Sequence, residues 1–472
     1  MSSEQFQAAH DSIYITGRLL LQSLQEIRAT REGEGEDTKA LQRIENDITK
    51  ALYALKEQKY QVAVIAPLNA GKNTFFNALM GADILPSEAE ASTDYRTDIR
   101  HIDSGQVPRF LEYREGNRQP VAIASGDAVE IAQKFLERIH DIQNHHNLDN
   151  TIRFEIEHPI EAISTLSSLA GFTLTDLPVE HERESIELPP ITDWKQMILE
   201  ALRISDVILF VFNDRDLETD SVSSFLNKLI DNYRRFLSVN QSKVFFVVNE
   251  IEPNVDTDKN IPRLIETWKQ KLLFLGFLNP IIYSASSRKG LLAKLIQSST
   301  ATSSHTKEFV QVFLGNYIEE TEEGEFRVPQ PIEIAPKALK DSGVPVIQEI
   351  VLQTIIQNSG WNLLNGVLTD LNKAAKAMEN SLDTSIRNWE IETESLRKNA
   401  DSQSLEPLIN EPIQTLENEV NHLATEPQKQ EAHPGQIVAI LKERKAQLNE
   451  YMDELTSIRK SLDSWKPVQA SS

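Results

Sequence analysis

The sequence has no cysteine among its 472 residues. Disulfides, thiolate metal sites and cysteine nucleophiles are therefore excluded, and this absence fits a reducing compartment. Long apolar runs are missing too, because nowhere do about 18 apolar residues follow one another as a transmembrane helix requires. The N-terminus also lacks the basic stretch and apolar core of a secretory signal. We therefore expect a cytoplasmic protein, either soluble or peripheral at a membrane.

Basic residues are scarce relative to acidic ones. The chain has 48 Lys and Arg against 71 Asp and Glu, which gives a net charge of −23. Charge of this sign repels nucleic-acid phosphates and anionic lipid headgroups. Nucleic acid is thus not an expected partner, and any contact with a membrane is expected to run through a partner protein.

The length predicts two architectural units, because one core rarely exceeds about 250–300 residues. The spacing of apolar residues also changes along the chain. Residues 6–27 and 41–55 have apolar positions at helical spacing and predict a helical hairpin. Short apolar runs typical of strands buried on both faces then alternate with helical patterns, which predicts a mostly parallel sheet with helices on both faces. These runs are residues 61–66, 172–175, 207–212, 244–248 and 281–283, with further strands expected at that sheet's edge around 97–114 and 152–156.

From residue 346 the chain is predicted to be helical, with two apolar seams whose members step by three and four residues. The seams are Leu364, Leu368, Leu371, Ala375, Met378, Leu382, Ile386 and Trp389, and Ile437, Leu441, Leu448, Tyr451, Leu455, Ile458, Leu462 and Trp465. Each seam needs a partner, which is either an intramolecular helical bundle or an intermolecular coiled coil. We expect four segments: N-terminal helices packing with a neck (1–58), an α/β domain (59–300), a connecting region (301–345) and a helical neck and trunk (346–472).

The segment 66–74, Ala-Pro-Leu-Asn-Ala-Gly-Lys-Asn-Thr, lies between a predicted strand and a predicted helix, where a phosphate-binding loop belongs. Consecutive backbone N–H groups and the helix N-terminus surround phosphates in such loops, and a Lys ammonium adds a point charge. The residues expected to do this are Asn69, Ala70, Gly71, Lys72, Asn73 and Thr74. The alternative is an ordinary strand-turn-helix in which Gly71 only makes the turn.

Two positions of this loop depart from the G-x-x-x-x-G-K-[ST] pattern. The opening Gly is Ala66, and the hydroxyl residue that should hold magnesium is Asn73. An amide oxygen lies farther along its side chain than a hydroxyl, and magnesium tolerates little departure from octahedral geometry. We therefore expect weak magnesium binding at Asn73, with the adjacent Thr74 as the alternative ligand. Such an Asn arises either by drift or by deliberate substitution.

Further candidate elements follow along the chain. Thr93 and Thr97 lie where the first switch should close over the γ-phosphate, and Asp176 ends a strand in Asp-x-Pro at the place of the second switch. Val179 stands where a flexible Gly is expected there. Asn249-Glu-Ile-Glu252 occupies the place of the guanine-reading Asn/Thr-Lys-x-Asp, so Glu250 replaces a Lys and Glu252 an Asp. Ser284 ends a strand as the last base-contacting loop would.

The order and spacing of these motifs resemble the dynamin superfamily, especially the bacterial dynamin-like proteins. Residues 75–81 (Phe-Phe-Asn-Ala-Leu-Met-Gly) followed by 84–87 (Ile-Leu-Pro-Ser) look like that family's signature after the phosphate loop, and 341–344 (Asp-Ser-Gly-Val) is similar to its exit from GTPase domain to helical neck. The resemblance implies a P-loop GTPase domain of α/β class plus an elongated α-helical neck and trunk bundle. It also implies heads that dimerise across bound nucleotide, and work on membranes.

By the same resemblance, GTP or GDP with Mg²⁺ is the expected cofactor. Lys72 matches the phosphate ligand, Asn73 the magnesium ligand, Asp176 the second switch, and either Thr93 or Thr97 the first-switch residue that positions catalytic water and faces the metal. Asn249, Glu252 and Ser284 match the base-contacting positions. The family's membrane-inserting tip has no visible counterpart between the two C-terminal seams.

Three functional hypotheses remain open at this level. In the first, the alterations at four motif positions (Ala66, Asn73, Val179, and Glu250 with Glu252) together weaken or abolish GTP hydrolysis, and the chain assembles with itself or with a dynamin-like paralogue. In the second, it is an active GTPase whose heads complete each other's sites on dimerisation and remodel membranes. In the third, the C-terminal helices act as a coiled-coil adaptor and the head binds no nucleotide.

Overall fold

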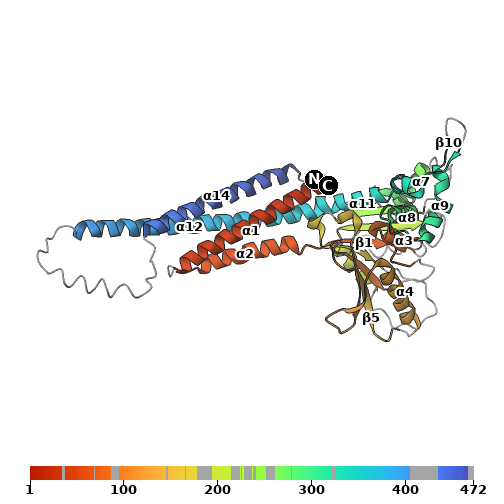
Figure 1. Cartoon of the computed structure of the whole chain (residues 1–472), viewed down its shortest axis with the longest axis horizontal. Helices are drawn as coiled ribbons and strands as arrows, with labels where there is room; N and C mark the ends of the chain where they lie inside the picture. The colour runs from red at the N-terminus through yellow and green to blue at the C-terminus, as the bar shows by residue number, and fades with distance from the viewer. Residues whose placement is uncertain are drawn as a thin grey trace. The chain divides into compact units, whose positions relative to one another are not determined.

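The computed structural model describes residues 1–33, 38–67, 70–86, 95–144, 147–164, 166–177, 194–213, 224, 226–227, 237, 241–250, 261–277, 279–320, 326–403 and 434–465. The chain divides into two compact units. We call Met1–Gln7 with Glu57–Trp361 the sheet unit, and Ala8–Lys56 with Asn362–Lys466 the helical unit. Figure 1 shows the elements of both.

The sheet unit is built on nine strands in the order β4-β3-β5-β2-β6-β1-β7-β8-β9. Strands β6, β1, β7, β8 and β9 are parallel to one another, whereas β2 runs antiparallel to β6 and parallel to β5, and β3 is antiparallel to both β5 and β4. The strands are β1 (Tyr60–Ile65), β2 (Arg96–His101), β3 (Arg109–Arg114), β4 (Val121–Ser125), β5 (Thr151–His158), β6 (Phe172–Asp176), β7 (Val207–Asn213), β8 (Val244–Asn249) and β9 (Ile282–Ser284).

The predicted fold class is confirmed: a mostly parallel sheet with helices, and a separate set of long helices. All five apolar runs are strands, and every residue of β7 and β8 is buried. The additional strands extend the sheet beyond β6. Sequence analysis missed β4, a short Val-Ala-Ile-Ala-Ser run whose residues are exposed or half-buried.

The sheet unit also contains helices. They are α3 (Lys72–Met80), α4 (Ala128–Asn144), α5 (Trp194–Ile204), α7 (Ile261–Phe274), α8 (Ser287–Gln297), α9 (Ser303–Val312), α10 (Pro331–Asp341) and α11 (Val344–Ile355). Short elements are the 3₁₀ turns η1 (Glu161–Ile163), η2 (Ser167–Leu169), η4 (Gln241–Lys243) and η5 (Leu314–Tyr317), the π-turn η6 (Ile356–Gly360), and the hairpin β10 (Glu319–Glu320) and β11 (Phe326–Arg327).

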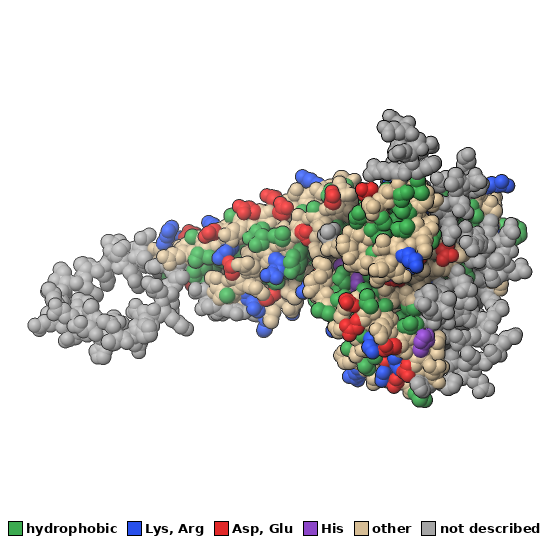
Figure 2. Space-filling model, turned by 45° about the vertical axis from the view of Figure 1, so that its right-hand side comes forward, with side chains coloured by type: hydrophobic (Ala, Val, Ile, Leu, Met, Phe, Trp, Pro, Cys, Tyr) green, Lys and Arg blue, Asp and Glu red, His purple; other side chains and the backbone are tan. Residues whose placement is uncertain are grey.

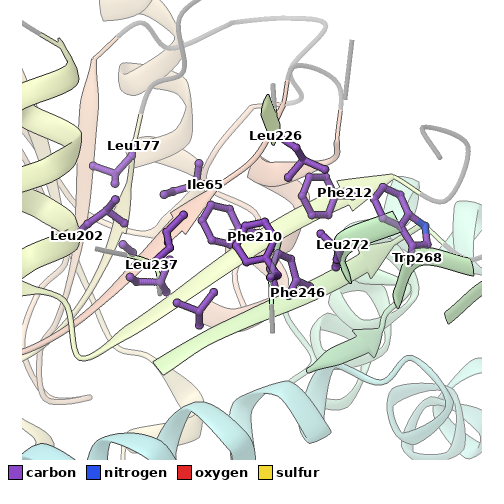
Figure 3. Packing of buried hydrophobic residues seen from close by; sticks show 14 of the residues in the cluster. Ile65, Leu177, Leu202, Phe210, Phe212, Leu226, Leu237, Phe246, Trp268 and Leu272 are labelled. Carbon is purple, nitrogen blue, oxygen red and sulfur yellow. The ribbon is translucent and has the colours of Figure 1, made fainter. Parts of the chain in front are cut away.

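The main core lies between the central strands and α7. Figure 3 shows Phe212 beside Trp268, and their ring centroids are 4.9 Å apart, nearly parallel. Phe246 continues the row from β8, with its ring centroid 5.4 Å from that of Phe210 on β7. These aromatic side chains are almost fully buried, so they anchor the strands whose ends form the candidate site.

A second core joins α8 to residues that follow it. Leu292 and Ile296 of α8 pack with Phe309 of α9 and with Ile334 and Ala338 of α10. Residues 301–345, expected from the sequence as a connecting region, thus contain helices that share a core with α8. The four predicted segment boundaries stay predictions.

The helical unit contains α1 (Ser3–Gly33), α2 (Lys39–Lys56), α12 (Trp361–Gln403) and α14 (Pro434–Ser464), although the first residues of α1 and Trp361 belong to the sheet unit. Leu364, Leu368 and Leu371 of the first seam are buried, and so are Leu448 and Leu455 of the second. The seams therefore pack within the chain, as the intramolecular alternative predicts. Described polar contacts join the same helices.

These contacts fix the helices in register. Arg459 of α14 donates to Thr369 of α12 at 2.7 Å, and Arg444 of α14 lies 2.8 Å from Glu26 of α1. Arg28 of α1 pairs with Glu45 of α2 at 3.3 Å. On the face shown in Figure 2, acidic and basic side chains lie interspersed. No described helix combines the length and the apolar character needed to cross a bilayer.

Two glycines of the helical unit should respond to alanine with opposite signs. A Cβ on Gly366 of α12 would meet open space, whereas one on Gly17 of α1 would lie 2.7 Å from Leu52 and 3.1 Å from Leu371. We expect Gly366→Ala to raise the free energy of unfolding by about 0.5–1 kcal/mol, because alanine loses less backbone entropy in a helix. Gly17→Ala is the matched control and should lower it. Chemical denaturation followed by circular dichroism measures both; a destabilised Gly366→Ala would contradict the packing described.

Candidate nucleotide site

The candidate site lies where the carboxyl ends of parallel strands meet. Register pairs Val64 of β1 with Asp176 of β6, and Val248 of β8 with Ser284 of β9. The loop after β1, the end of β6 and the end of β8 therefore share one edge of the sheet. Ligands bind at this edge in open α/β sheets.

The structure describes residues 66–67 and 70–74 of the predicted phosphate loop. Gly71 is in the left-handed region, with φ 74° and ψ 28°, and caps the start of α3. Ala70 before it is fully buried. The N-terminus of α3 thus faces the loop with its first N–H groups, which favour a bound anion. Asn69, also expected to contact phosphate, lies outside the described residues.

Lys72 and Asp176 form an ion pair at the centre of this edge. Their Nζ and Oδ1 atoms are 2.7 Å apart, and the residues are 9 % and 2 % exposed. The Lys72 ammonium also lies 3.5 Å from the carbonyl oxygen of Leu177. Thr97 of β2 is the register partner of Asp176 and is buried, with its hydroxyl donating to the carbonyl of Tyr95 at 3.4 Å. The structure thus brings three predicted site residues together.

The magnesium position is less suited to its ligand. The side-chain Nδ2 of Asn73 donates to the carbonyl of Pro86 at 2.8 Å, which ties the amide to the chain that follows α3. Thr74 is half-buried and lines a cleft of about 700 Å³ together with Asp83, Pro86 and Arg288. Of the residues matched to the metal, Asn73 offers one amide oxygen and Thr97 one hydroxyl oxygen, while the Asp176 carboxylate is paired with Lys72. An amide oxygen, a hydroxyl oxygen and a paired carboxylate form a poor set of magnesium ligands.

Asn249 connects the phosphate loop to α8. It is fully buried, and its Nδ2 donates to the carbonyls of Ala70 at 3.2 Å and Gly71 at 3.4 Å. Its Oδ1 accepts from the backbone N–H of Ser287 at 3.1 Å and from the Ser287 hydroxyl. Sequence analysis missed Ser287, the first residue of α8. No sequence signal pointed to it, because its hydroxyl bonds to a residue 38 positions away and not to its own helix.

Ser284 occupies a different part of the same edge. Its carbonyl oxygen lies against Gly343, where an added Cβ would be 2.3 Å away. Ser284 also lines a second cavity with Lys289, Asp341 and Gly343. The backbone of Ser286 donates to the carbonyl of Ser342 at 2.8 Å. The segment after β9 is thus held between Asn249 on one side and residues 342–343 on the other.

Glu250 follows Asn249 in a backbone conformation uncommon for a residue with a side chain. Its φ is 59°, in the left-handed region. Oε2 accepts from Nδ2 of Asn213, the last residue of β7, at 2.5 Å. Oε1 lies 2.7 Å from the place where a Cβ on Gly71 would stand. A carboxylate therefore lies directly against the phosphate loop. Thr93, Val179 and Glu252 fall outside the described residues.

Comparison with known proteins agrees with this geometry. Residues 62–251, which contain the phosphate loop, Asp176 and Asn249, match the sequence profile described as "Dynamin family". This segment belongs to the dynamin family. Dynamin-family GTPase domains in general bind GTP or GDP with Mg²⁺.

The similar proteins align with very different shares of this chain. A bacterial dynamin-like protein from Nostoc punctiforme is 31% identical over 84 residues, which are 16% of this chain and 12% of that protein. Two solved chains come from an oligomerised bacterial dynamin pair, described as providing a mechanism for the long-range sensing and tethering of membranes. One has a TM-score of 0.48 and 14% identity and covers 87% of this chain and 52% of its own. The other has 0.43 and 13%, covering 96% and 78%.

Proposed function

We propose that this protein is a dynamin-family assembly protein whose nucleotide site binds GTP weakly and hydrolyses it slowly or not at all. The observation that carries the proposal is that the residues matched to phosphate and metal already have partners within the chain. Lys72 is paired with Asp176, and the Asn73 amide is bonded to Pro86. A triphosphate must compete with Asp176 for the Lys72 ammonium, which reduces its affinity, and the bond from the Asn73 nitrogen to Pro86 limits how the amide oxygen can turn toward magnesium.

Assembly is proposed to involve a second copy of the chain or a dynamin-like paralogue, at a membrane reached through that partner. The family of residues 62–251 and the long helical bundle support this. The net charge of −23 disfavours direct contact with anionic lipid.

An active GTPase is the second candidate, and a specific observation favours it. The left-handed Gly71, the N-terminus of α3 and the buried Lys72 ammonium support phosphate binding. In that case turnover would rise steeply with protein concentration, because heads would complete each other's sites on dimerisation.

Calorimetric titration of the full chain with GTP, GDP and ATP in magnesium tests the proposal. We expect GTP to bind with a Kd weaker than about 10 μM, which corresponds to less than about 7 kcal/mol of binding free energy. Asn73→Ser should tighten GTP binding only when magnesium is present, because it supplies a hydroxyl ligand. Submicromolar GTP binding by the unchanged chain would overturn the proposal, and GTP turnover that grows with protein concentration would favour the second candidate.

A further inference from the structure

Glu250 places negative charge at the loop that should receive phosphate. The carboxylate is held by two features: the left-handed backbone at φ 59°, and the bond that Asn213 donates to Oε2 at 2.5 Å. The other oxygen, Oε1, is the atom nearest to a Cβ built on Gly71, at 2.7 Å. Its neighbour Asn249 is itself fixed to the Gly71 carbonyl. The position of the charge relative to the loop is therefore set by the fold.

The effect of this carboxylate depends on the charge of the ligand. Two like charges near a protein surface repel each other with an energy that falls with distance and with salt. Whatever other groups surround Glu250, removing its charge makes the potential at Gly71 more positive. That change favours a ligand with four phosphate charges more than one with two, and leaves an uncharged ligand nearly unaffected.

We propose that Glu250 is a specificity-determining residue that makes the phosphate loop disfavour nucleoside triphosphates relative to monophosphates. This inference rests on the proposed function, in which the loop is a nucleotide site of low affinity. It adds a cause that is separate from the Lys72–Asp176 pair and from Asn73. The Glu250 carboxylate repels the negative charge of the nucleotide itself, so its effect needs no metal.

Glu250→Gln is the variant that isolates the charge. A glutamine has the same length, and its amide oxygen can accept the bond from Asn213, so the local structure should be kept. Glu250→Lys reverses the charge and should act in the same direction more strongly. Glu137→Gln is the matched control, because it removes one acid from the exposed face of α4, where Glu137 pairs with Lys134.

The experiment measures the affinities of GMP, GDP and GTP for the full chain and the three variants, in EDTA so that magnesium does not change the ligand charge. At low salt we expect Glu250→Gln to bind GTP about fivefold more tightly than the unchanged chain, GDP by a smaller factor, and GMP by less than about twofold. In 0.5 M NaCl the gain for GTP should shrink, because salt screens the repulsion. Glu137→Gln should match the unchanged chain.

Each outcome tests either the inference about Glu250 or the proposed function. An equal gain for all three nucleotides, or a gain that salt leaves intact, would show that the side chain acts by shape and would overturn the inference. The inference would also be overturned if Glu250→Gln bound GTP no more tightly than the unchanged chain. This includes the case in which neither of these two proteins binds GTP up to 10 mM, which corresponds to about 2.7 kcal/mol of binding free energy. Submicromolar GTP binding by the unchanged chain in magnesium would overturn the proposed function instead, whatever the ratio between variants.

Discussion

Replacing Asn249 with alanine is expected to lower the free energy of unfolding of the sheet unit by about 2–4 kcal/mol. Asn249 is fully buried and joins two carbonyls of the phosphate loop to the N–H and hydroxyl of Ser287. Alanine leaves these groups without their partner, and an unsatisfied buried polar group costs about 1–3 kcal/mol. Urea denaturation followed by tryptophan fluorescence measures the loss. Nucleotide affinity should fall with it, because the loop loses its tie to α8.

Ser287→Ala provides the control for this prediction. It removes one hydroxyl from the same cluster but keeps the backbone N–H bond to Asn249 at 3.1 Å. Its cost should be nearer 1 kcal/mol, the usual net value of a single hydrogen bond. If Asn249→Ala proved no more harmful than Ser287→Ala, the bonds to Ala70 and Gly71 would not contribute to stability as described.

Most of the fold could be predicted because its strongest signals are local. Strands β7 and β8 are buried on both faces, so their residues form nearly continuous apolar runs. Such runs are recognisable from the sequence alone. The two C-terminal seams were recognisable for the same reason, since their period fixes one apolar side of each helix. β4 was missed although its Val-Ala-Ile-Ala run is apolar, because the run is short, contains two alanines and lies at the end of the sheet, where it is not fully buried.

The candidate site was predictable only in part. Motif order indicated that Lys72, Asp176 and Asn249 meet at one edge, and the structure brings them together. What the order of motifs does not contain is which side chains take each other as partners. The bond from Asn73 to Pro86 and the contact of Glu250 with Gly71 join segments by three-dimensional placement. Such contacts depend on backbone angles that a pattern of residue types does not specify.

Alanine at Gly343 is expected to destabilise the sheet unit by about 3 kcal/mol or more. Gly343 has φ 73°, where a residue with a Cβ pays roughly 1–2 kcal/mol. The added Cβ would also stand 2.3 Å from the carbonyl oxygen of Ser284, and forced overlap in a packed region costs roughly 1–3 kcal/mol. Backbone cannot turn away as a flexible side chain would, so the two costs should add.

The destabilisation caused by Gly343→Ala should extend to the candidate nucleotide site, because Gly343 lies beside the residues that position α8. The carbonyl of Ser342 accepts from Ser286, directly before the Ser287 that bonds to Asn249. Gly315→Ala is the control: it lies in the same unit, has no positive φ, and its Cβ would meet no atom within 4 Å. Thermal unfolding should separate the two variants clearly. Equal melting temperatures would mean that Gly343 does not pack closely against the end of β9. The contacts that lead from residues 342–343 through Ser286 and Ser287 to Asn249 would then not contribute to stability.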